Sequence, residues 1–207
     1  MKLNIIFVTA AAIALASCTG KAFVRTDSGF TAETALCNVQ VECFGKDIIR
    51  VQKYPLCNSC PEVKSFAVVK SPEKSGFSVR HLGDVITMKT SALTVELNVK
   101  TSVVRFLDAQ GQQLIAEKEE SFSLTPVNGL VPERFRVSQT FLLDDDDHIY
   151  GLGQHQQGHF DMRGCHVHLE NVNTEVAIPI VHSSKGYALF WDNTAVSEFD
   201  DGEEGMS

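Results

Sequence analysis

The sequence predicts an all-β protein, an antiparallel β-sandwich or barrel, and three observations support that fold class. Apolar and polar residues alternate with a period of two, while the period of an amphipathic helix is almost absent. Turn signals such as Gly83-Asp84 and Asp108–Gly111 separate the alternating runs at short intervals. A chain of 207 residues, 43% of them hydrophobic, is also long enough to bury one core without disulfides.

The expected strands follow one another along the chain. Leu93–Lys100 shows the pattern most clearly, because Leu93, Val95, Leu97 and Val99 alternate with polar residues. We expect one face of each strand to be buried and the other to be wet. The other runs of this character are Val39–Cys43, Asp47–Tyr54, Ser65–Val69, Phe77–His81, Val85–Thr90, Val103–Leu107, Gln113–Ala116 and Arg134–Leu143.

A β-hairpin is expected near the end of the chain. The apolar runs Val176–Val181 and Tyr187–Trp191 are joined by the polar turn Ser183–Gly186. Polar residues crowd both ends of this hairpin, at Asn173–Glu175 and at Trp191–Asn193. Asn and Asp favour turns because their side chains bond the local backbone, so these ends are expected to fix loops.

Asp144–Asp147 is the one run of like charges. Carboxylate oxygens suit Ca²⁺, but the run lacks the spaced ligands and the glycine of an EF-hand loop. A solvated turn is therefore the favoured interpretation.

The N-terminus has the layout of an export signal. One lysine is followed by an apolar run from Ile5 to Ala16, which is too short to span a bilayer. Leu-Ala-Ser-Cys then resembles a lipobox, which predicts cleavage after residue 17 and lipidation of Cys18. Residues 18–34 are expected to be a tether, and the protein an exported bacterial lipoprotein of the periplasm, outer membrane or cell surface. An ordinary signal peptide is the alternative.

Five further cysteines leave at least one thiol unpaired. Cys57 and Cys60 form a lone CxxC without the second pair of a zinc site or the strand-to-helix context of a redox motif. A local disulfide or two free thiols in a loop is the favoured interpretation.

Histidines and acids concentrate in the last third. Six of the seven histidines lie between His148 and His182, and His166 and His168 would share a face of a strand. No local metal-ligand signature accompanies them, so we expect no metal and no cofactor, with the histidines lining a groove or a sheet surface. The net charge of −8 and the scattered cations argue against nucleic acid as a partner. The spacing cannot pair the acids for glycosidase chemistry; the candidates are Asp161, Glu170, Glu175 and Asp192.

Four blocks in one order resemble the N-terminal region of glycoside hydrolase family 31, in its bacterial α-xylosidase branch. They are YGLGQHQQG at Tyr150–Gly158, NTEVAIP at Asn173–Pro179, SSKGY at Ser183–Tyr187 and WDN at Trp191–Asn193. The sequence departs from the family pattern at Gln154, which is commonly Glu, and at Ala188, which is commonly Gly.

The resemblance implies that residues 35–207 form a galactose-mutarotase-like β-sandwich that packs on a (β/α)₈ barrel. The barrel carries the aspartate nucleophile and the aspartate acid/base, and it needs roughly 200 residues or more. No segment of this sequence matches the nucleophile motif. We therefore expect a sandwich that ends before the barrel, has no catalytic residues and hydrolyses nothing alone.

The resemblance further implies that a loop of the sandwich shapes the sugar-binding mouth. The ligand would be a carbohydrate with a terminal α-xylosyl or α-glucosyl unit, and the partners would be the barrel and, through Cys18, a membrane. An alternative role for the WDN block is a structural corner. Alternative functions are a stand-alone carbohydrate-binding surface lipoprotein or a non-functional gene fragment. The expected substrate contacts are Gln154, His155, Gln157, Trp191, Asp192 and Asn193.

Overall fold

The computed structural model describes residues 23–56, 65–127 and 134–207, and every regular element in these ranges is a β-strand. No helix among them is long and apolar enough to cross a membrane. In chain order the strands are β1 (Phe23–Thr26), β2 (Gly29–Glu33), β3 (Asn38–Gly45), β4 (Ile48–Tyr54), β5 (Ser78–Leu82), β6 (Val85–Lys89), β7 (Thr94–Asn98), β8 (Val104–Leu107), β9 (Gln113–Glu117), β10 (Ser123–Val127), β11 (Arg134–Ser138), β12 (Phe141–Leu142), β13 (Ile149–Gln154), β14 (His166–Leu169), β15 (Val176–Ser183), β16 (Ala188–Phe190), β17 (Ser197–Gly202) and β18 (Gly205–Met206).

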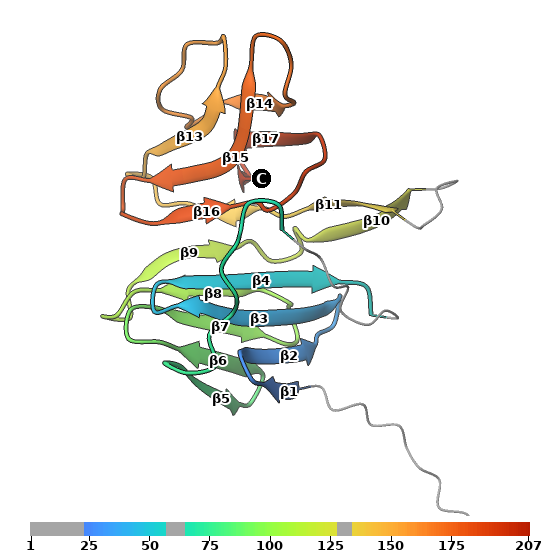
Figure 1. Cartoon of the computed structure of the whole chain (residues 1–207), viewed down its shortest axis with the longest axis vertical. Coiled ribbons are helices and arrows are strands. Elements are labelled where there is room, and N and C mark those ends of the chain that lie inside the picture. The colour runs from blue at the N-terminus through green and yellow to red at the C-terminus, as the bar shows by residue number, and fades with distance from the viewer. Residues whose placement is uncertain (1–22, 57–64, 128–133) are drawn as a thin grey trace, which may run out of the picture.

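The strands form four antiparallel sheets, which confirms the all-β sandwich (Figure 1). A nine-stranded sheet, here the long sheet, runs in the order β14-β17-β18-β12-β9-β8-β7-β6-β5. The N-terminal sheet, β1-β2-β3-β4, and the C-terminal sheet, β13-β15-β16, each cover part of the long sheet. Strands β10 and β11 pair as a separate ribbon. We call described residues 23–127 the N-terminal half and residues 134–207 the C-terminal half.

The core of the N-terminal half lies between the N-terminal sheet and strands β6 to β8. Alternate residues of each strand enter it, as the period of two predicts. Val95 and Leu97 are fully buried, whereas Thr94, Glu96 and Asn98 face outward. The fully or almost fully buried members are Phe30, Ala32, Cys37, Val39, Val41, Cys43, Ile86, Met88, Val95, Leu97 and Val104.

The core of the C-terminal half lies between the C-terminal sheet and the other end of the long sheet. Phe106 packs against both cores and so links them. The buried members of this second core are Ile115, from β9, and Phe141, Ile149, Leu152, Met162, Val167, Leu169, Val181, Phe199 and Met206. One continuous sheet thus carries two separate packing clusters.

The structure contradicts the strand expected at Ser65–Val69. This segment has no strand pairing, and Phe66 and Val69 are 89% and 98% exposed. The Ser65 hydroxyl accepts hydrogen bonds from the backbone N–H groups of Ala67 and Val68 at 3.1 and 2.9 Å. Such a local bond competes with strand pairing, which explains why the apolar run misled the prediction.

The tether expected at residues 18–34 is wrong from Phe23 onward, because β1 and β2 form a hairpin there. Phe30 and Ala32 are buried in the core, and the rings of Phe23 and Phe30 lie 5.9 Å apart. The turn residues Asp27 and Ser28 gave this segment its polar appearance. Cys18, Cys57 and Cys60 lie outside the described residues. Within them, Cys37, Cys43 and Cys165 are free thiols.

Candidate functional site

The candidate site begins where β13 bends away from β15. The register between these strands shifts between Gly151 and Gly153, and three consecutive residues, Gly151, Leu152 and Gly153, have positive φ angles of 123°, 65° and 100°. A Cβ atom on Gly153 would overlap the carbonyl oxygen of Val176. Glycine is therefore required here so that the two backbones can approach, and the bend directs the following residues into a loop.

That loop encloses a cavity of about 200 Å³. Its polar lining consists of amide and imidazole side chains, which both donate and accept hydrogen bonds. Met162 and Val167 add an apolar surface from the core below. The lining residues are Gly153, Gln154, His155, Gln157, His159, Met162 and Val167. Three of the predicted contacts, Gln154, His155 and Gln157, are thus brought together.

His155 presents a buried acceptor to this cavity. Its side chain is 4% exposed, and its Nε2 lies 2.8 Å from the carbonyl oxygen of Leu152, so Nε2 donates a hydrogen bond to that carbonyl. In the neutral ring Nδ1 bears a lone pair, and this atom is buried and makes no hydrogen bond. An Oε2 atom of Glu175 lies 3.6 Å from Nδ1, and it is also an acceptor. Two acceptors facing one space suit a ligand with hydroxyl donors, because an unpaired buried acceptor is costly.

The WDN block lies elsewhere. Trp191 donates its backbone N–H to the carbonyl oxygen of Pro179 at 2.8 Å, and the side chain of Asn193 accepts the N–H of Ala195 at 3.0 Å. Asp192 accepts a hydrogen bond from the Ser65 hydroxyl at 3.0 Å, a contact across 127 positions of sequence. None of Trp191, Asp192 and Asn193 lines the cavity. They form the corner after β16 and attach the Ser65 segment to it.

Asp147 corrects the interpretation of Asp144–Asp147 as a solvated turn. The first three aspartates are exposed, but Asp147 is 2% exposed. Its carboxylate accepts hydrogen bonds from the hydroxyls of Ser183, Ser184 and Tyr187, at 2.6, 2.9 and 3.1 Å. Burial alone would raise the pKa of Asp147, but these hydroxyl donors outweigh it and lower that pKa.

Arg163 extends the Asp147 contacts to the long sheet. Its guanidinium donates to the carbonyl oxygen of Asp147 at 2.6 Å and to Oδ2 of Asp201 at 2.8 Å. Asp201 also accepts the backbone N–H of Gly164 at 2.8 Å. This network fixes the end of the cavity loop against β17. Burial raises the pKa of the Tyr187 hydroxyl by more than the hydrogen bond with Ser183 lowers it.

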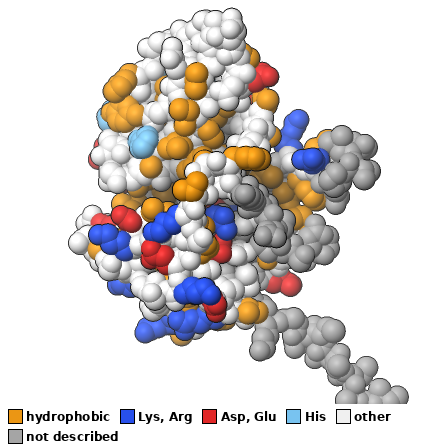
Figure 2. Space-filling view, in the orientation of Figure 1, with side chains coloured by type: hydrophobic (Ala, Val, Ile, Leu, Met, Phe, Trp, Pro, Cys, Tyr) orange, Lys and Arg blue, Asp and Glu red, His pale blue; other side chains and the backbone are white. Residues whose placement is uncertain are grey.

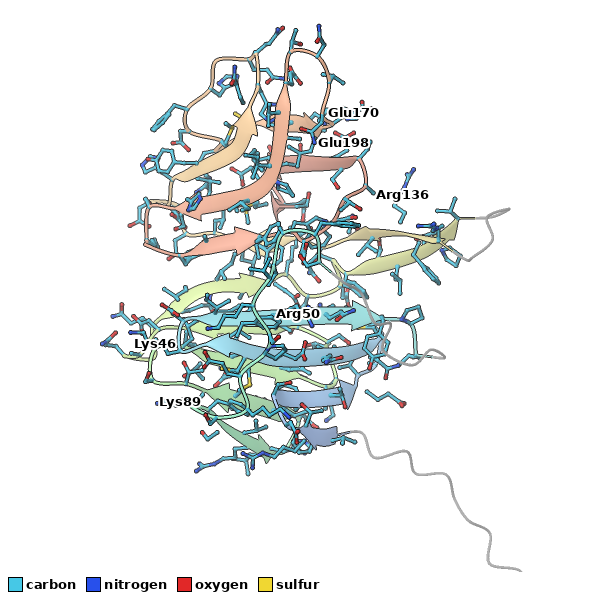
Figure 3. The ribbon with its side chains drawn as sticks, in the orientation of Figure 1. Lys46, Arg50, Lys89, Arg136, Glu170 and Glu198 are labelled. Atoms are coloured by element: carbon cyan, nitrogen blue, oxygen red, sulfur yellow. The ribbon has the colours of Figure 1, made fainter. Side chains whose placement is uncertain are left out.

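His166 and His168 share the outer face of β14, as predicted. His168 Nδ1 lies 2.6 Å from Glu198 and its Nε2 lies 3.3 Å from Glu170. The two glutamates are labelled in Figure 3. The hydrogen bonds to Glu198 and then to Glu170 raise the pKa of His168. Among the residues that the structure describes, no three His, Cys, Asp or Glu side chains are arranged to hold a metal ion.

The four candidate acids are held separately. Asp161 contacts His148 at 2.5 Å, Glu170 contacts His168, Glu175 faces His155 and Asp192 accepts from Ser65. These contacts pair none of the four acids with another. Each acid therefore has a partner of its own, and Asp161 also lines a second cleft together with Asp145, Asp147, Asp201 and Glu203.

The outer face of the C-terminal sheet is apolar and exposed. Val176 and Ile178 on β15 are 50% and 46% exposed, and Phe160, whose ring lies 5.0 Å from that of Tyr150, is 82% exposed. Figure 2 shows hydrophobic side chains gathered over this part of the molecule. An exposed apolar face of this kind marks an interaction surface.

Comparisons with known proteins find a matching family model and relatives of this chain. Residues 38–200 match the model of the glycosyl hydrolase 31 N-terminal galactose mutarotase-like domain. An α-xylosidase of Saccharolobus solfataricus is 28% identical over 166 residues, which are 75% of this chain and 22% of that protein. Alpha-glucosidase 2 of Bacillus thermoamyloliquefaciens is 27% identical over 194 residues, 86% of this chain and 23% of the relative.

Solved structures agree with the sequence relatives. The GH31 α-xylosidase of Xanthomonas citri superposes with a TM-score of 0.77 and 30% identity, over 87% of this chain and 20% of that one. A GH31 α-xylosidase from a soil metagenome, complexed with xylose, gives a TM-score of 0.74 at 22% identity, over 86% of this chain and 29% of that one. The chain spans between 22% and 34% of the length of the curated relatives it matches.

Proposed function

Because the chain belongs to the glycosyl hydrolase 31 N-terminal galactose mutarotase-like domain family, we propose that it is the carbohydrate-recognising accessory domain of an α-xylosidase-type α-glycosidase. The whole enzyme would remove terminal α-xylosyl or α-glucosyl units with retention of configuration. In this proposal the two catalytic aspartates belong to a barrel domain, and this domain supplies part of the sugar-binding mouth.

The cavity at the end of β13 carries the proposal. A polyhydroxylated ligand needs acceptors for its hydroxyl hydrogens and donors for its oxygens, and Gln154, His155 and Gln157 offer both. The unpaired Nδ1 of His155 gains a hydrogen bond when a hydroxyl enters. Trp191, Asp192 and Asn193 would act indirectly, by holding the corner after β16.

The apolar outer face of the C-terminal sheet is the surface we assign to the barrel. Val176, Ile178 and Phe160 would leave water when the barrel covers them, which supplies the driving force for docking. The cavity loop follows β13, and the apolar face lies on β15, which pairs with β13. Docking of the barrel on this face would therefore place the loop beside the barrel. Cys18 is proposed to anchor the assembly to a membrane through its acyl chain.

An enzyme assay tests the division of labour. The isolated chain is expected to release no product from an aryl α-xyloside, because the proposal assigns both catalytic aspartates to the barrel domain. Adding a barrel domain from a family 31 α-xylosidase is expected to change KM for xylosyl oligosaccharides. Turnover by the isolated chain would overturn the proposal.

Calorimetry separates the accessory role from the two alternatives. A stand-alone sugar-binding lipoprotein would bind xyloglucan oligosaccharides with full affinity in the absence of any barrel. A non-functional fragment would bind neither sugar nor barrel. The proposed accessory domain binds the barrel, and His155→Ala weakens sugar binding in that complex while His81→Ala, at an exposed histidine of the N-terminal half, leaves it unchanged.

A further inference from the structure

Charge is divided unequally between the two halves. Residues 23–56 and 65–127 contain 11 Lys and Arg and 11 Asp and Glu, whereas residues 134–207 contain 4 Lys and Arg and 13 Asp and Glu. The C-terminal half therefore carries a formal net charge of −9, and the described N-terminal half is neutral. An anionic surface would repel the C-terminal half and not the N-terminal half.

One edge of the N-terminal half combines cations with exposed aliphatic side chains. Strands β1 and β5 are the outermost strands of their sheets, and the rings of Phe23 and His81 lie 5.3 Å apart across them. We call the exposed cationic and aliphatic residues of β1, β5 and the neighbouring β6 the N-terminal edge; its members are Val24, Arg25, Arg80, Leu82 and Lys89.

The sheet register places two of these cations on one face. Ser78 pairs with Lys89 and Arg80 pairs with Thr87, so Arg80 and Lys89 project from the same side of the β5–β6 hairpin. Leu82 lies on that side too and is 77% exposed. Within β5 and β6 this side contains no acid, since its other members are serine, valine and threonine. On the next strand, β7, Glu96 pairs with Thr87 and is held by Arg105. Figure 3 shows Lys89 pointing away from the body of the molecule.

Two acids close to the N-terminal edge are paired with other cations, whereas Glu33, at the end of β2, is exposed and adds one negative charge. Asp27 lies 3.1 Å from the ammonium group of Lys74, and Asp84 lies 2.8 Å from that of Lys100. These pairs are neutral overall, so they do not cancel the charge of the N-terminal edge. The edge retains a local excess of positive charge beside two exposed aliphatic residues, Val24 and Leu82.

The chain reaches this edge five residues after Cys18, at Phe23. Five extended residues span at most about 18 Å. A lipid on Cys18 would therefore hold β1 close to the headgroups. Figure 1 shows β1 and β5 at the end of the molecule opposite β13 and β14.

We propose that the N-terminal edge docks on an anionic lipid surface, with the acidic C-terminal half and its cavity directed away from the membrane. The orientation rests on the proposed acylation of Cys18, but the lipid-binding surface itself does not need the anchor. Headgroup phosphates pair with Arg25, Arg80 and Lys89, and Leu82 enters the interface. Repulsion of the C-terminal half fixes the polarity.

Vesicle binding by the chain starting at Thr19 tests the surface without the anchor. The chain is expected to sediment with phosphatidylcholine vesicles that contain phosphatidylglycerol, and not with phosphatidylcholine alone. Each basic residue near such a surface contributes about fivefold in affinity, so Arg25→Gln/Arg80→Gln/Lys89→Gln should lose roughly a hundredfold. Added salt should abolish the binding.

A matched variant removes the same charge elsewhere. Lys118→Gln/Arg134→Gln/Arg136→Gln keeps the N-terminal edge intact and should bind anionic vesicles as the wild type does. Near-ultraviolet circular dichroism verifies that both variants are folded. Equal binding to neutral and anionic vesicles, or equal losses in the two variants, would overturn the proposed surface. Labelling of the full chain with radioactive palmitate tests Cys18 independently, so the two proposals fail separately.

Discussion

The two halves of the molecule are packed around different kinds of buried side chain. In the N-terminal half, residues such as Phe30, Ile86 and Leu97 are fully buried and apolar. In the C-terminal half, the core includes a buried carboxylate, Asp147, and the outer face of the covering sheet is apolar and exposed. The N-terminal half also buries two carboxylates, Glu42 and Glu117, but each of these is paired with a cation, whereas Asp147 is held by uncharged hydroxyl groups.

This difference bears on why the candidate site lies in the C-terminal half. A closed apolar core gives stability but offers a ligand nothing to bond. Buried polar groups cost free energy unless they are satisfied, and the unpaired Nδ1 of His155 lies in the half whose loops are held by the Asp147 contacts. The comparison predicts that damage to the first half is global and damage to the second is local.

Leu97→Ala should produce the largest effect. The side chain is fully buried in the core of the N-terminal half, and such a truncation costs about 2–5 kcal/mol. Because the long sheet carries both halves, the loss should lower the stability of every strand. Urea unfolding followed by hydrogen exchange measures it. If only β6 to β8 lost protection, the two halves would be independent.

Asp147→Ala should come next, with a more local result. The substitution leaves three hydroxyl donors without their acceptor, at a cost of about 2–4 kcal/mol. Hydrogen exchange should speed up in β13, β15 and β16 and remain slow in β6 and β7. Asp145→Ala, at an exposed position of the same run, should stay within about 0.5 kcal/mol of the wild type. Equal losses in the two variants would show that the Asp147 contacts do not hold the sheet.

Gly153→Ala should disturb the cavity more than the fold. Its positive φ and the nearby carbonyl of Val176 exclude a Cβ atom, so the strands must separate, at a cost of about 1–3 kcal/mol. Sugar binding in the barrel complex is expected to be lost. Gly158→Ala also has a positive φ, but its Cβ would meet open space, so it should cost about 1 kcal/mol or less and preserve binding. Retained binding in Gly153→Ala would separate the bend from the site.

Lowering the pH should destabilise the two halves unequally, and we expect these changes to be smaller than those of the three substitutions. The lowered pKa of Asp147 gives stability that is present above its ordinary pKa and is lost as the pH falls through the folded value. Burial raises the pKa of Glu117, more than Lys53 lowers it. That group favours folding below its ordinary pKa and loses this contribution as the pH rises. Hydrogen exchange below pH ~4 should therefore show faster opening of β15 than of β8. Equal acceleration of both would contradict the assignment.

The sequence predicted the strands whose two faces differ most. Leu93–Lys100 became β7 because alternation reports burial of one face directly. The strand prediction at Ser65–Val69 was wrong because apolar character says nothing about whether a partner strand is present. The strands β1 and β2 were missed because their turn residues, Asp27 and Ser28, dominate a short segment.

The site was predictable only in part. The Gly-rich block at Tyr150–Gly158 drew attention to Gln154, His155 and Gln157, which line the cavity. Glu175 was noted only as an acid, since its approach to His155 depends on the β13–β15 register. Asp147 was hidden within a charged run. The usable signal was its spacing of two from the buried Ile149, which places both side chains on the inward face.

Nitrogen-15 NMR of the His155 ring tests most directly whether the C-terminal half recognises sugar. Titration of the barrel complex with an α-xylosyl oligosaccharide should shift the Nδ1 resonance of His155, because a hydroxyl would bond that lone pair, while the ring resonances of His81 in the N-terminal half stay unchanged. A saturating titration that left the Nδ1 resonance of His155 in place would contradict the assignment of the cavity to carbohydrate.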